Sequence, residues 1–385
     1  MPELGFPRRI ILGEPASEAL KGVLQLHKAN KILVVSDPVV SRLDFYKEII
    51  EALKGEYEIE EFTEVEAEPS IETATKAGEK ARGKDAVVAI GGGSVIDVAK
   101  TASVLAKRPG LNVEDIAPFN PLGIELEKPV LIAVPTTAGT GSDASYGIVL
   151  SKTEPGVGKV KVAVGSYEVI PYATILDHRI PASAPGRVKV GAIADALSHA
   201  LEALASTNSN PFSDALAEKA ITLILTNAPK AVKEDDEEAW LNLHAAATMA
   251  GIAFSNSGLG LAHAIAHPLG ALLGLHHGTT VGIVMLGVLE VYMRDPQVSV
   301  KYDRVKRLLE HVHNLPERPS LLDHVTWLYG EIGQPKRFHE LGIDREKYMD
   351  AVAKASELAY HDPDIAFSPV IPSTDDIRDL LQRIY

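Results

Sequence analysis

The sequence predicts an α/β nucleotide-binding domain over residues 1–182, with a parallel sheet in a variant of the Rossmann fold, followed by an all-α helical domain over residues 183–385. In the first part, short apolar runs alternate with stretches of helical periodicity, which is typical of a parallel sheet covered by helices. In the second part, the apolar spacing is helical throughout and no run reads as a strand. A chain of 385 residues is also too long for one ordinary hydrophobic core.

The elements of the first domain follow from the positions of its apolar runs. The expected strands cover residues 31–37, 56–62, 85–90, 129–134 and 173–177. One helix is expected from Asp37 to Leu53, because Asp at the N-cap followed by Pro is a common helix start, and another is expected over 71–80. The Pro- and Gly-containing segment 181–186 reads as the link between the domains.

The second domain is expected to contain helices only. Their apolar periodicity places them at 188–206, 211–227, 237–255 and 261–273, and around Leu308, Leu322 and Val352. The charged run 233–238 reads as a solvated helix start.

Charge and composition exclude several classes of partner. The formal net charge of −14 argues against nucleic acid and against an anionic membrane, since both reward a basic surface. The N-terminal segment lacks the apolar core of a signal peptide, and no run of about eighteen apolar residues exists, so we expect a cytoplasmic protein. The absence of cysteine excludes thiolate sites and leaves histidine and carboxylates as strong metal ligands.

Three consecutive glycines stand between an expected strand and an expected helix, at the start of the segment 91–100. Backbone N–H groups there can approach a phosphate closely, and the helix N-terminus adds a partial positive charge. A plain tight turn is the alternative, but three glycines in a row exceed what a turn needs. We therefore predict a phosphate-binding loop. Its assigned cofactor contacts are Gly91, Gly92, Gly93, Ser94 and Asp97.

A second loop of small residues follows the strand 129–134 and carries hydroxyls that suit a pyrophosphate or a ribose. Its assigned cofactor contacts are Thr136, Thr137, Thr140 and Ser142. A candidate acid for the ribose, Asp37, precedes the glycines by 54 residues, whereas the acid follows them in the standard dinucleotide fingerprint. The same parts in a different order indicate a variant of the doubly wound fold.

Four of the thirteen histidines lie between His263 and His277, in an otherwise apolar stretch. Buried imidazoles need partners, and a metal ion takes several at once. His263 and His267 are four residues apart, as are Asp195 and His199, so each pair shares one helix face. With a further histidine at 276 or 277, this set can offer one carboxylate and three of its imidazoles to a single ion, which suits Fe²⁺ or Zn²⁺ without choosing between them.

Together these segments resemble the iron-containing (metal-dependent, group III) alcohol dehydrogenase family. The resemblance rests on residues 91–100, 135–142, 195–202 and 258–278, whose order and spacing also agree, and it covers essentially the whole chain. It implies the dehydroquinate synthase-like architecture of a nucleotide-binding domain followed by a helical domain. It also implies a homodimer.

The resemblance further implies roles for single residues of the second domain. The matched metal ligands are Asp195, His199, His263 and His277. His276 is the competing candidate for the last of these. His267 matches a position near the metal that is assigned to catalysis, and we predict that it relays the substrate proton to solvent.

In the first domain, the resemblance concerns the choice of cofactor. Asp37 matches a carboxylate that favours NAD over NADP, because it can accept from the ribose 2′-OH and would repel a 2′-phosphate, although NADP is not excluded. Lys161 matches a lysine near the nicotinamide ribose. Two positions depart from the family pattern: Asp143 stands where Glu is usual, and 367–373 lacks the usual Asn-Pro-Arg. We expect both to bear on the substrate or on outer contacts of the cofactor.

The expected activity is hydride transfer between the nicotinamide and a small neutral primary alcohol, diol or aldehyde, with the metal as Lewis acid. No Lys or Arg occurs between Lys233 and Arg294, whereas a phosphate- or carboxylate-bearing substrate would want a cationic clamp. The apolar residues expected near the histidines are Phe254, Leu259, Leu269 and Leu272. The alternatives are a dehydroquinate-synthase-like lyase or a maleylacetate-reductase-like enzyme, both acting on anionic substrates, and a non-enzymatic metal- or nucleotide-binding module.

Overall fold

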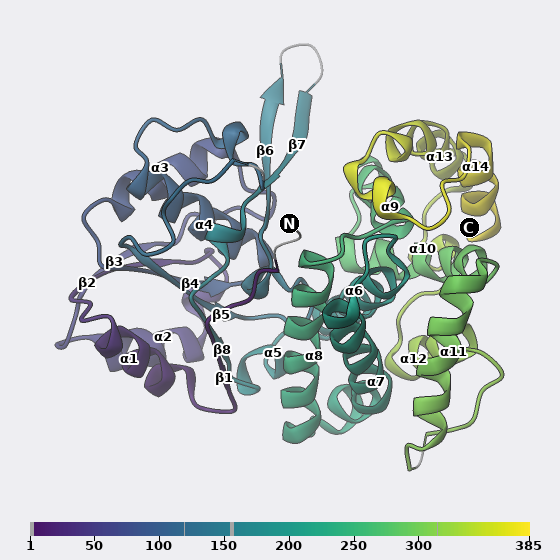
Figure 1. The fold of residues 1–385 in the computed structure, drawn as a ribbon, viewed down its shortest axis with the longest axis horizontal. Helices are drawn as coiled ribbons and strands as arrows, with labels where there is room; N and C mark the ends of the chain where they lie inside the picture. The colour runs from purple at the N-terminus through teal and green to yellow at the C-terminus, as the bar shows by residue number, and fades with distance from the viewer. Residues whose placement is uncertain (1–3, 119, 155–157, 314) are drawn as a thin grey trace. The chain divides into compact units, whose positions relative to one another are not determined.

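The structure is a computed structural model that describes residues 4–118, 120–154, 158–313 and 315–385 of the chain. The chain divides into two compact units, Met1–Ser183 (unit 1) and Ala184–Tyr385 (unit 2). This division falls one residue after the boundary expected from the sequence. Within the described ranges, unit 1 contains all the strands and unit 2 contains helices only, so the predicted fold class is confirmed (Figure 1).

Unit 1 is built on a six-stranded sheet in the order β1-β8-β5-β4-β2-β3, and all neighbouring strands are parallel. These strands are β1 (Arg9–Leu12), β2 (Lys31–Val35), β3 (Glu58–Phe62), β4 (Ala86–Gly91), β5 (Val130–Pro135) and β8 (Ala173–Leu176). Because β2, β4 and β5 are neighbours and parallel, the segments that follow them leave the sheet at one edge. These are the segments that begin with Asp37, the glycines and Thr136.

Helices cover both faces of this sheet. Helices α1 (Ala16–Leu26) and α2 (Asp44–Leu53) pack on one face with Ile32 and Val34 of β2. Helices α3 (Ile71–Ala81) and α4 (Gly93–Lys107) pack on the other with Leu33 and Val35 (Figure 1). Successive side chains of a strand point to opposite faces, so a continuous apolar run such as 32–35 contributes side chains to the hydrophobic cores on both faces of the sheet.

Three features of unit 1 differ from the sequence-based expectation. The helix expected from Asp37 is interrupted, because the 3-10 turn η1 (Val40–Arg42) is followed by an extended Leu43 (ψ 153°) and α2 begins only at Asp44. The strand β1 and helix α1 were not predicted. Nor was the antiparallel hairpin of β6 (Gly147–Glu154) and β7 (Gly158–Gly165), which projects from the unit in Figure 1. In β1 the apolar side chains are not buried, since Ile10 and Leu12 are 46% and 49% exposed.

In unit 2, α6 packs against α7, α8 and α10. Its helices are α6 (Gly186–Ala205), α7 (Pro211–Glu234), α8 (Glu237–Ser255), α9 (Leu261–Leu273), α10 (His277–Tyr292), α11 (Pro296–Glu310), α12 (Leu321–Ile332), α13 (Arg345–Tyr360) and α14 (Thr374–Arg383). Shorter helical elements of the two units are η2 (Val113–Asp115), η3 (Ser142–Ala144), η4 (Tyr167–Val169), α5 (Arg179–Ala182), η5 (Phe338–Leu341) and η6 (Pro363–Phe367). The bounds of α8 and α9 are those predicted, whereas α7 continues past residue 227. Across the described ranges, every helix is too short or too polar to cross a membrane.

Candidate active site

The three consecutive glycines at positions 91–93 serve different structural purposes. Gly91 is the last residue of β4, Gly92 is the N-cap of α4, and Gly93 is its first residue. A Cβ on Gly91 would collide with the first turn of α4, and one on Gly93 would lie 3.1 Å from Thr140 of the second loop. A Cβ on Gly92 would have Thr137 Oγ1, 3.9 Å away, as its nearest neighbour outside the adjoining residues. The N-terminus of α4 is therefore open on this side, next to Thr137, which suits a phosphate.

Asp97 and Ser142 are hydrogen-bonded to each other. Ser142 Oγ donates to Asp97 Oδ1 (2.6 Å), and the backbone N–H of Val149 donates to Asp97 Oδ2 (2.9 Å). The fully buried Lys100 donates from Nζ to Ser142 Oγ (3.0 Å) and to the carbonyl oxygen of Gly147 (2.7 Å). Burial raises the pKa of Asp97 and lowers that of Lys100 to about 8. These contacts tie α4 to the second loop and hold the two predicted cofactor segments together.

Three further predicted cofactor residues are Ser94 after β4, Thr136 after β5 and Lys161 on β7. Ser94 Oγ donates to the carbonyl oxygen of Ala67 (2.7 Å), and the backbone N–H of Thr136 donates to the carbonyl oxygen of Gly91 (3.0 Å). Both residues therefore help to fix the backbone around the glycines. Lys161 is exposed on β7 of the hairpin.

Asp37 lies after β2, the strand next to β4, although it is far from the glycines in the sequence. Its Oδ1 accepts hydrogen bonds from the backbone N–H groups of Val39 (2.8 Å) and Val40 (2.9 Å). The carboxylate thus closes the turn that leads into η1, whose N-cap residue is Val39, and it does not cap one long helix as predicted. The carboxylate follows the sheet at the same edge as the glycines, which is where an acid for a ribose is expected.

Asp143, which departs from the family pattern, is buried inside unit 1. It is 3% exposed, and Thr174 Oγ1 of β8 donates to its Oδ2 (2.8 Å). This position favours a role in anchoring the loop to the sheet over the outer contacts that we expected.

Three helices of unit 2 bring the predicted metal ligands together. Asp195 and His199 lie on α6, His263 on α9, and His277 is the first residue of α10. The Nε2 atoms of His277, His263 and His199 lie 3.5, 3.7 and 3.8 Å from a single atom, Asp195 Oδ1. Ligand atoms of Asp195, His263 and His277 are all within 4.8 Å of one another, and His199 lies outside this tightest group.

The close approach of α6 and α10 depends on two glycines. A Cβ on Gly278 would collide with the carbonyl oxygen of Gly191 and would lie 3.2 Å from the Cβ of Asp195. A Cβ on Gly191 would lie 2.7 Å from Nδ1 of His276, whose ring therefore covers this glycine. Since neither residue has a side chain, the two backbones can meet, and Asp195 comes within reach of His277.

The charges in the cluster show that it fits a metal cation. Glu202 Oε2 lies 2.5 Å from His263 Nδ1, so the other ring nitrogen, Nε2, faces Asp195 Oδ1. Within the part of the chain that the structure describes, neither of these facing atoms has a hydrogen-bond partner, and both are buried. Burial would lower the pKa of His263, yet the carboxylates of Glu202 and Asp195 raise it to about 10. A positive charge is therefore favoured between Nε2 and Oδ1, and a divalent metal bound by both meets this need.

The carboxyl group of Asp195 is itself strongly biased towards its charged form. Burial would raise the pKa of this carboxyl, but His199, His263 and His277 around it hold the pKa well below its usual range. An ionised carboxylate among imidazoles is a donor set that suits Fe²⁺ or Zn²⁺.

His267 lies between the cluster and two carboxylates that the sequence did not single out. Its ring stacks on that of His277 (centroids 5.3 Å apart), and its Nδ1 lies 2.9 Å from Asp362 Oδ2 and 3.9 Å from Asp364 Oδ2. Burial raises the pKa of Asp364 to about 6. The side chain of His267 is 26% exposed, whereas that of His263 is 1% exposed. His267 thus connects the buried cluster with solvent.

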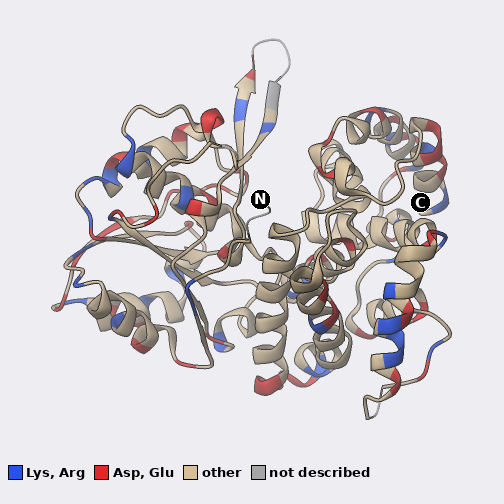
Figure 2. Cartoon of the chain, in the orientation of Figure 1, with Lys and Arg blue, Asp and Glu red and all other residues tan. Residues whose placement is uncertain are grey.

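Apart from the carboxylates of Glu202, Asp362 and Asp364, the side chains next to the cluster are largely apolar. Figure 2 shows α9 without Lys, Arg, Asp or Glu, and the sequence has no Lys or Arg from 234 to 293. Phe254 packs its ring against that of His199 (centroids 4.6 Å apart). Of the other apolar residues expected here, Leu269 is fully buried and Leu272 is 40% exposed.

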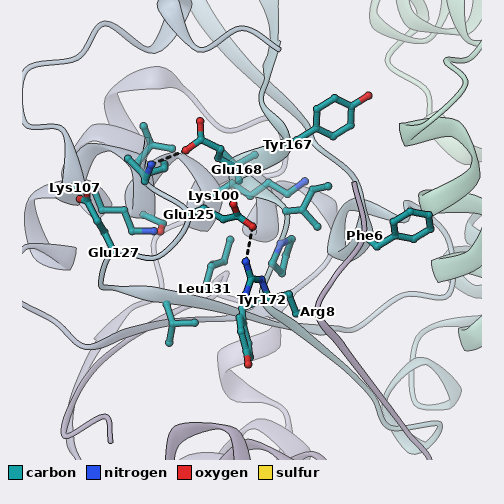
Figure 3. Close-up of a pocket in the computed structure, with 17 residues that line it drawn as sticks. Phe6, Arg8, Lys100, Lys107, Glu125, Glu127, Leu131, Tyr167, Glu168 and Tyr172 are labelled. Atoms are coloured by element: carbon teal, nitrogen blue, oxygen red, sulfur yellow. Dashed lines mark hydrogen bonds and ion pairs between the residues drawn. The ribbon is translucent and has the colours of Figure 1, made fainter. Parts of the chain in front are cut away.

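The small pocket in Figure 3 is a separate feature of unit 1. It has a volume of about 60 Å³, and no predicted site residue is among the described residues that line it. Arg8 pairs with Glu125 (2.7 Å), the backbone N–H of Ile124 donates to Glu168 (2.6 Å), and burial lowers the pKa of Lys107 to about 8. A space of this size holds only a few water molecules. It is therefore not a candidate for a dinucleotide.

A parallel α/β unit with an open helix N-terminus after its glycine run, followed by a helical unit with a carboxylate–imidazole cluster, is the arrangement expected of a metal-dependent enzyme that binds a dinucleotide. Comparison with known families agrees. Residues 7–178 match the family described as iron-containing alcohol dehydrogenase, and residues 189–385 match the C-terminal part of the Fe-containing alcohol dehydrogenase family. The chain belongs to the iron-containing alcohol dehydrogenase family, and the predicted enzyme class, an oxidoreductase acting on alcohols, is confirmed.

Similar proteins cover the whole chain. An alcohol dehydrogenase of Thermococcus barophilus is 36% identical over 98% of this chain and 97% of its own length. The 1-propanol dehydrogenase PduQ of Citrobacter freundii is 27% identical, with 100% of both chains covered. The crystal structure of an iron-containing alcohol dehydrogenase from Thermococcus thioreducens is 32% identical, with a TM-score of 0.86 and coverage of 100% of this chain and 99% of that one.

Proposed function

We propose that this enzyme oxidises small neutral primary alcohols or diols, and reduces the matching aldehydes, with NAD as hydride carrier. The observation that carries the proposal is the convergence of three imidazole Nε2 atoms on Asp195 Oδ1, at 3.5, 3.7 and 3.8 Å. The residues that would hold Fe²⁺ or Zn²⁺ are Asp195, His199, His263 and His277. When bound, such a metal acts as a Lewis acid towards an alcohol oxygen, and the nicotinamide supplies the hydride chemistry.

The remaining chemistry falls to side chains of this chain. His267 accepts the substrate proton at its Nε2 atom and passes it to solvent, while Asp362 holds the ring through Nδ1 (2.9 Å). The apolar surroundings, including Phe254 against His199, exclude water and select substrates without charge. In unit 1, the open N-terminus of α4 at Gly92 binds the pyrophosphate.

The test is a substrate panel with the metal-loaded enzyme. Protein loaded with Fe²⁺ under anaerobic conditions, or with Zn²⁺, is mixed with NAD and 1-propanol, 1-butanol or 1,2-propanediol, and the absorbance of the reduced cofactor is followed. We expect turnover with these alcohols, since no Lys or Arg occurs from 234 to 293 to clamp an anion. Turnover of maleylacetate or of a phosphorylated sugar acid, with none of the alcohols, would overturn the proposal.

The preference for NAD is proposed to depend on the charge of Asp37. Asp37→Asn keeps an oxygen that can accept from Val39 and Val40, so the turn before η1 stays closed, but it removes the charge that would repel a 2′-phosphate. We expect the ratio of kcat/KM for NADP to kcat/KM for NAD to rise about tenfold or more. Asp44→Asn, in the first turn of α2, removes the same charge away from the strand end and serves as the control. An unchanged ratio in Asp37→Asn would contradict this role.

The proposal also includes a homodimer, as the family resemblance implies, and a cytoplasmic location, as the sequence composition suggests. Light scattering of the purified enzyme at micromolar concentration measures its mass directly. A mass near 41.2 kDa, that of one chain, would contradict the dimer.

A further inference from the structure

Glu202 is a buried carboxylate placed against both the backbone and the side chain of His263. It lies on α6, is 1% exposed, and was not assigned any role from the sequence. Its Oε1 accepts from the backbone N–H of Ala262 (2.5 Å), and its Oε2 accepts from the backbone N–H of His263 (3.3 Å) and lies 2.5 Å from Nδ1 of the same residue. One carboxylate thus meets the N-terminus of α9 and the imidazole that α9 presents.

The N-terminus of α9 explains part of this arrangement. Its N-cap residue is Gly260, which has no side chain to accept the first N–H groups of the helix. The carboxylate of Glu202 accepts two of them from the neighbouring helix, where the helix dipole also favours a negative charge. A capping role alone, however, would not need the contact with Nδ1.

We propose that Glu202 is the positioning residue of the metal centre: it keeps the proton of His263 on Nδ1, so that Nε2 is free to bind the metal, and it supplies the second negative charge of the site. The inference rests on the metal centre of the proposed function. An imidazole that donates through one nitrogen presents the lone pair of the other, and a carboxylate in this position also fixes the ring orientation. With Asp195 on the opposite side of the ring, two carboxylates balance one divalent cation.

The chain offers a matched control that separates capping from positioning. Tyr292 is fully buried, and its Oη accepts from the backbone N–H of Leu261 (2.8 Å) at the same end of α9. Tyr292→Phe removes this acceptor and a hydroxyl that also contacts Glu202, but it keeps the carboxylate of Glu202 and both nitrogens of His263. Glu202→Gln keeps one oxygen for the helix N-terminus and removes the charge and one of the paired acceptors.

The experiment measures the dissociation constant for Zn²⁺ of the full-length protein by competition with a chelator. We expect Glu202→Gln to raise this constant about 10–100-fold, and Tyr292→Phe to leave it near the wild-type value. Melting of the metal-free variants measures the loss of capping separately. A wild-type Zn²⁺ affinity in Glu202→Gln, or an equal loss in Tyr292→Phe, would overturn the inference.

A measurement on the wild-type enzyme covers the case in which Glu202→Gln does not fold. In ¹⁵N-histidine-labelled protein loaded with Zn²⁺, the resonances that disappear in His263→Gln report the protonation of this ring. We expect a protonated Nδ1 and an unprotonated Nε2, and the reverse assignment would overturn the inference. If the wild-type protein bound no Zn²⁺ and no Fe²⁺, the proposed function would fail, and this inference with it.

Discussion

Asp195→Asn is expected to cost the enzyme its metal and its activity together. The carboxylate oxygen Oδ1 is the common neighbour of three imidazoles, at 3.5–3.8 Å, and it is buried. Asparagine has nearly the same shape but no charge, so the attraction for a divalent cation falls while the packing is kept. Removing one member of a buried charged set costs about 3–5 kcal/mol. We therefore expect metal affinity to fall about a hundred- to several-thousandfold, with a parallel loss of alcohol oxidation.

The measurement compares Zn²⁺ dissociation constants and kcat/KM for 1-propanol in the wild type and the variant. The matched control is Asp214→Asn in the same unit, a carboxylate that accepts from Lys301 (3.0 Å) and lies outside the cluster. The control should keep its metal. An Asp195→Asn protein that binds Zn²⁺ as tightly as the wild type would remove Asp195 from the metal site, and the convergence of the imidazoles would then need another explanation.

The fold could be predicted wherever the burial of side chains leaves a recognisable hydrophobic pattern in the sequence. The runs in β2, β4 and β5 are apolar on both sides because helices cover both faces, and their strand assignments follow directly. The strand β1 could not be found in this way, because it lies at the sheet edge with Ile10 and Leu12 nearly half exposed. The break at Leu43 was also hidden, since an Asp that closes the turn before η1 looks the same in the sequence as the N-cap of a longer helix.

Some residues of the candidate site could be predicted from the sequence, and others could not. Histidines stand out in an apolar stretch, and a spacing of four places a pair on one helix face, so the ligand candidates could be named from residues and resemblance. Glu202 had a usable signal, because Asp195, His199 and Glu202 are spaced for a single face of α6. Asp362 had none. It is 95 residues from His267, and only the folded chain brings the two side chains to 2.9 Å.

Asp97 and Ser142 show the opposite case, in which the sequence points to a ligand and the structure offers an internal partner. Both were assigned to the cofactor because they stand in phosphate-type loops. In the structure they bond to each other at 2.6 Å, with Lys100 and Val149 completing the network. The two loops are thereby fixed relative to one another, which a rigid cofactor site requires. A polar residue in such a motif can thus stabilise the loop itself, whether or not it also contacts the cofactor.

Gly278→Ala is expected to weaken metal binding, although Gly278 is not itself a metal ligand. The added Cβ would collide with the carbonyl oxygen of Gly191, a backbone atom that cannot rotate away, and would lie 3.2 Å from the Cβ of Asp195. Helices α6 and α10 must then move apart, which carries Asp195 away from His277. Crowding of this kind costs about 1–3 kcal/mol of stability. Because metal ligands must be placed to within about 0.5 Å, we also expect metal affinity to fall tenfold or more.

The control for this prediction is Gly270→Ala, in α9. There the added Cβ would lie 3.5 Å from Thr280 Oγ1, an ordinary contact. Both substitutions place alanine in a helix, which by itself favours the folded state by about 0.5–1 kcal/mol. If only Gly278→Ala lowers the melting temperature and the Zn²⁺ affinity, the loss is therefore due to the disturbed close approach of α6 and α10. If Gly278→Ala matched Gly270→Ala in both measurements, the close approach at Gly191 would not be what holds Asp195 and His277 together.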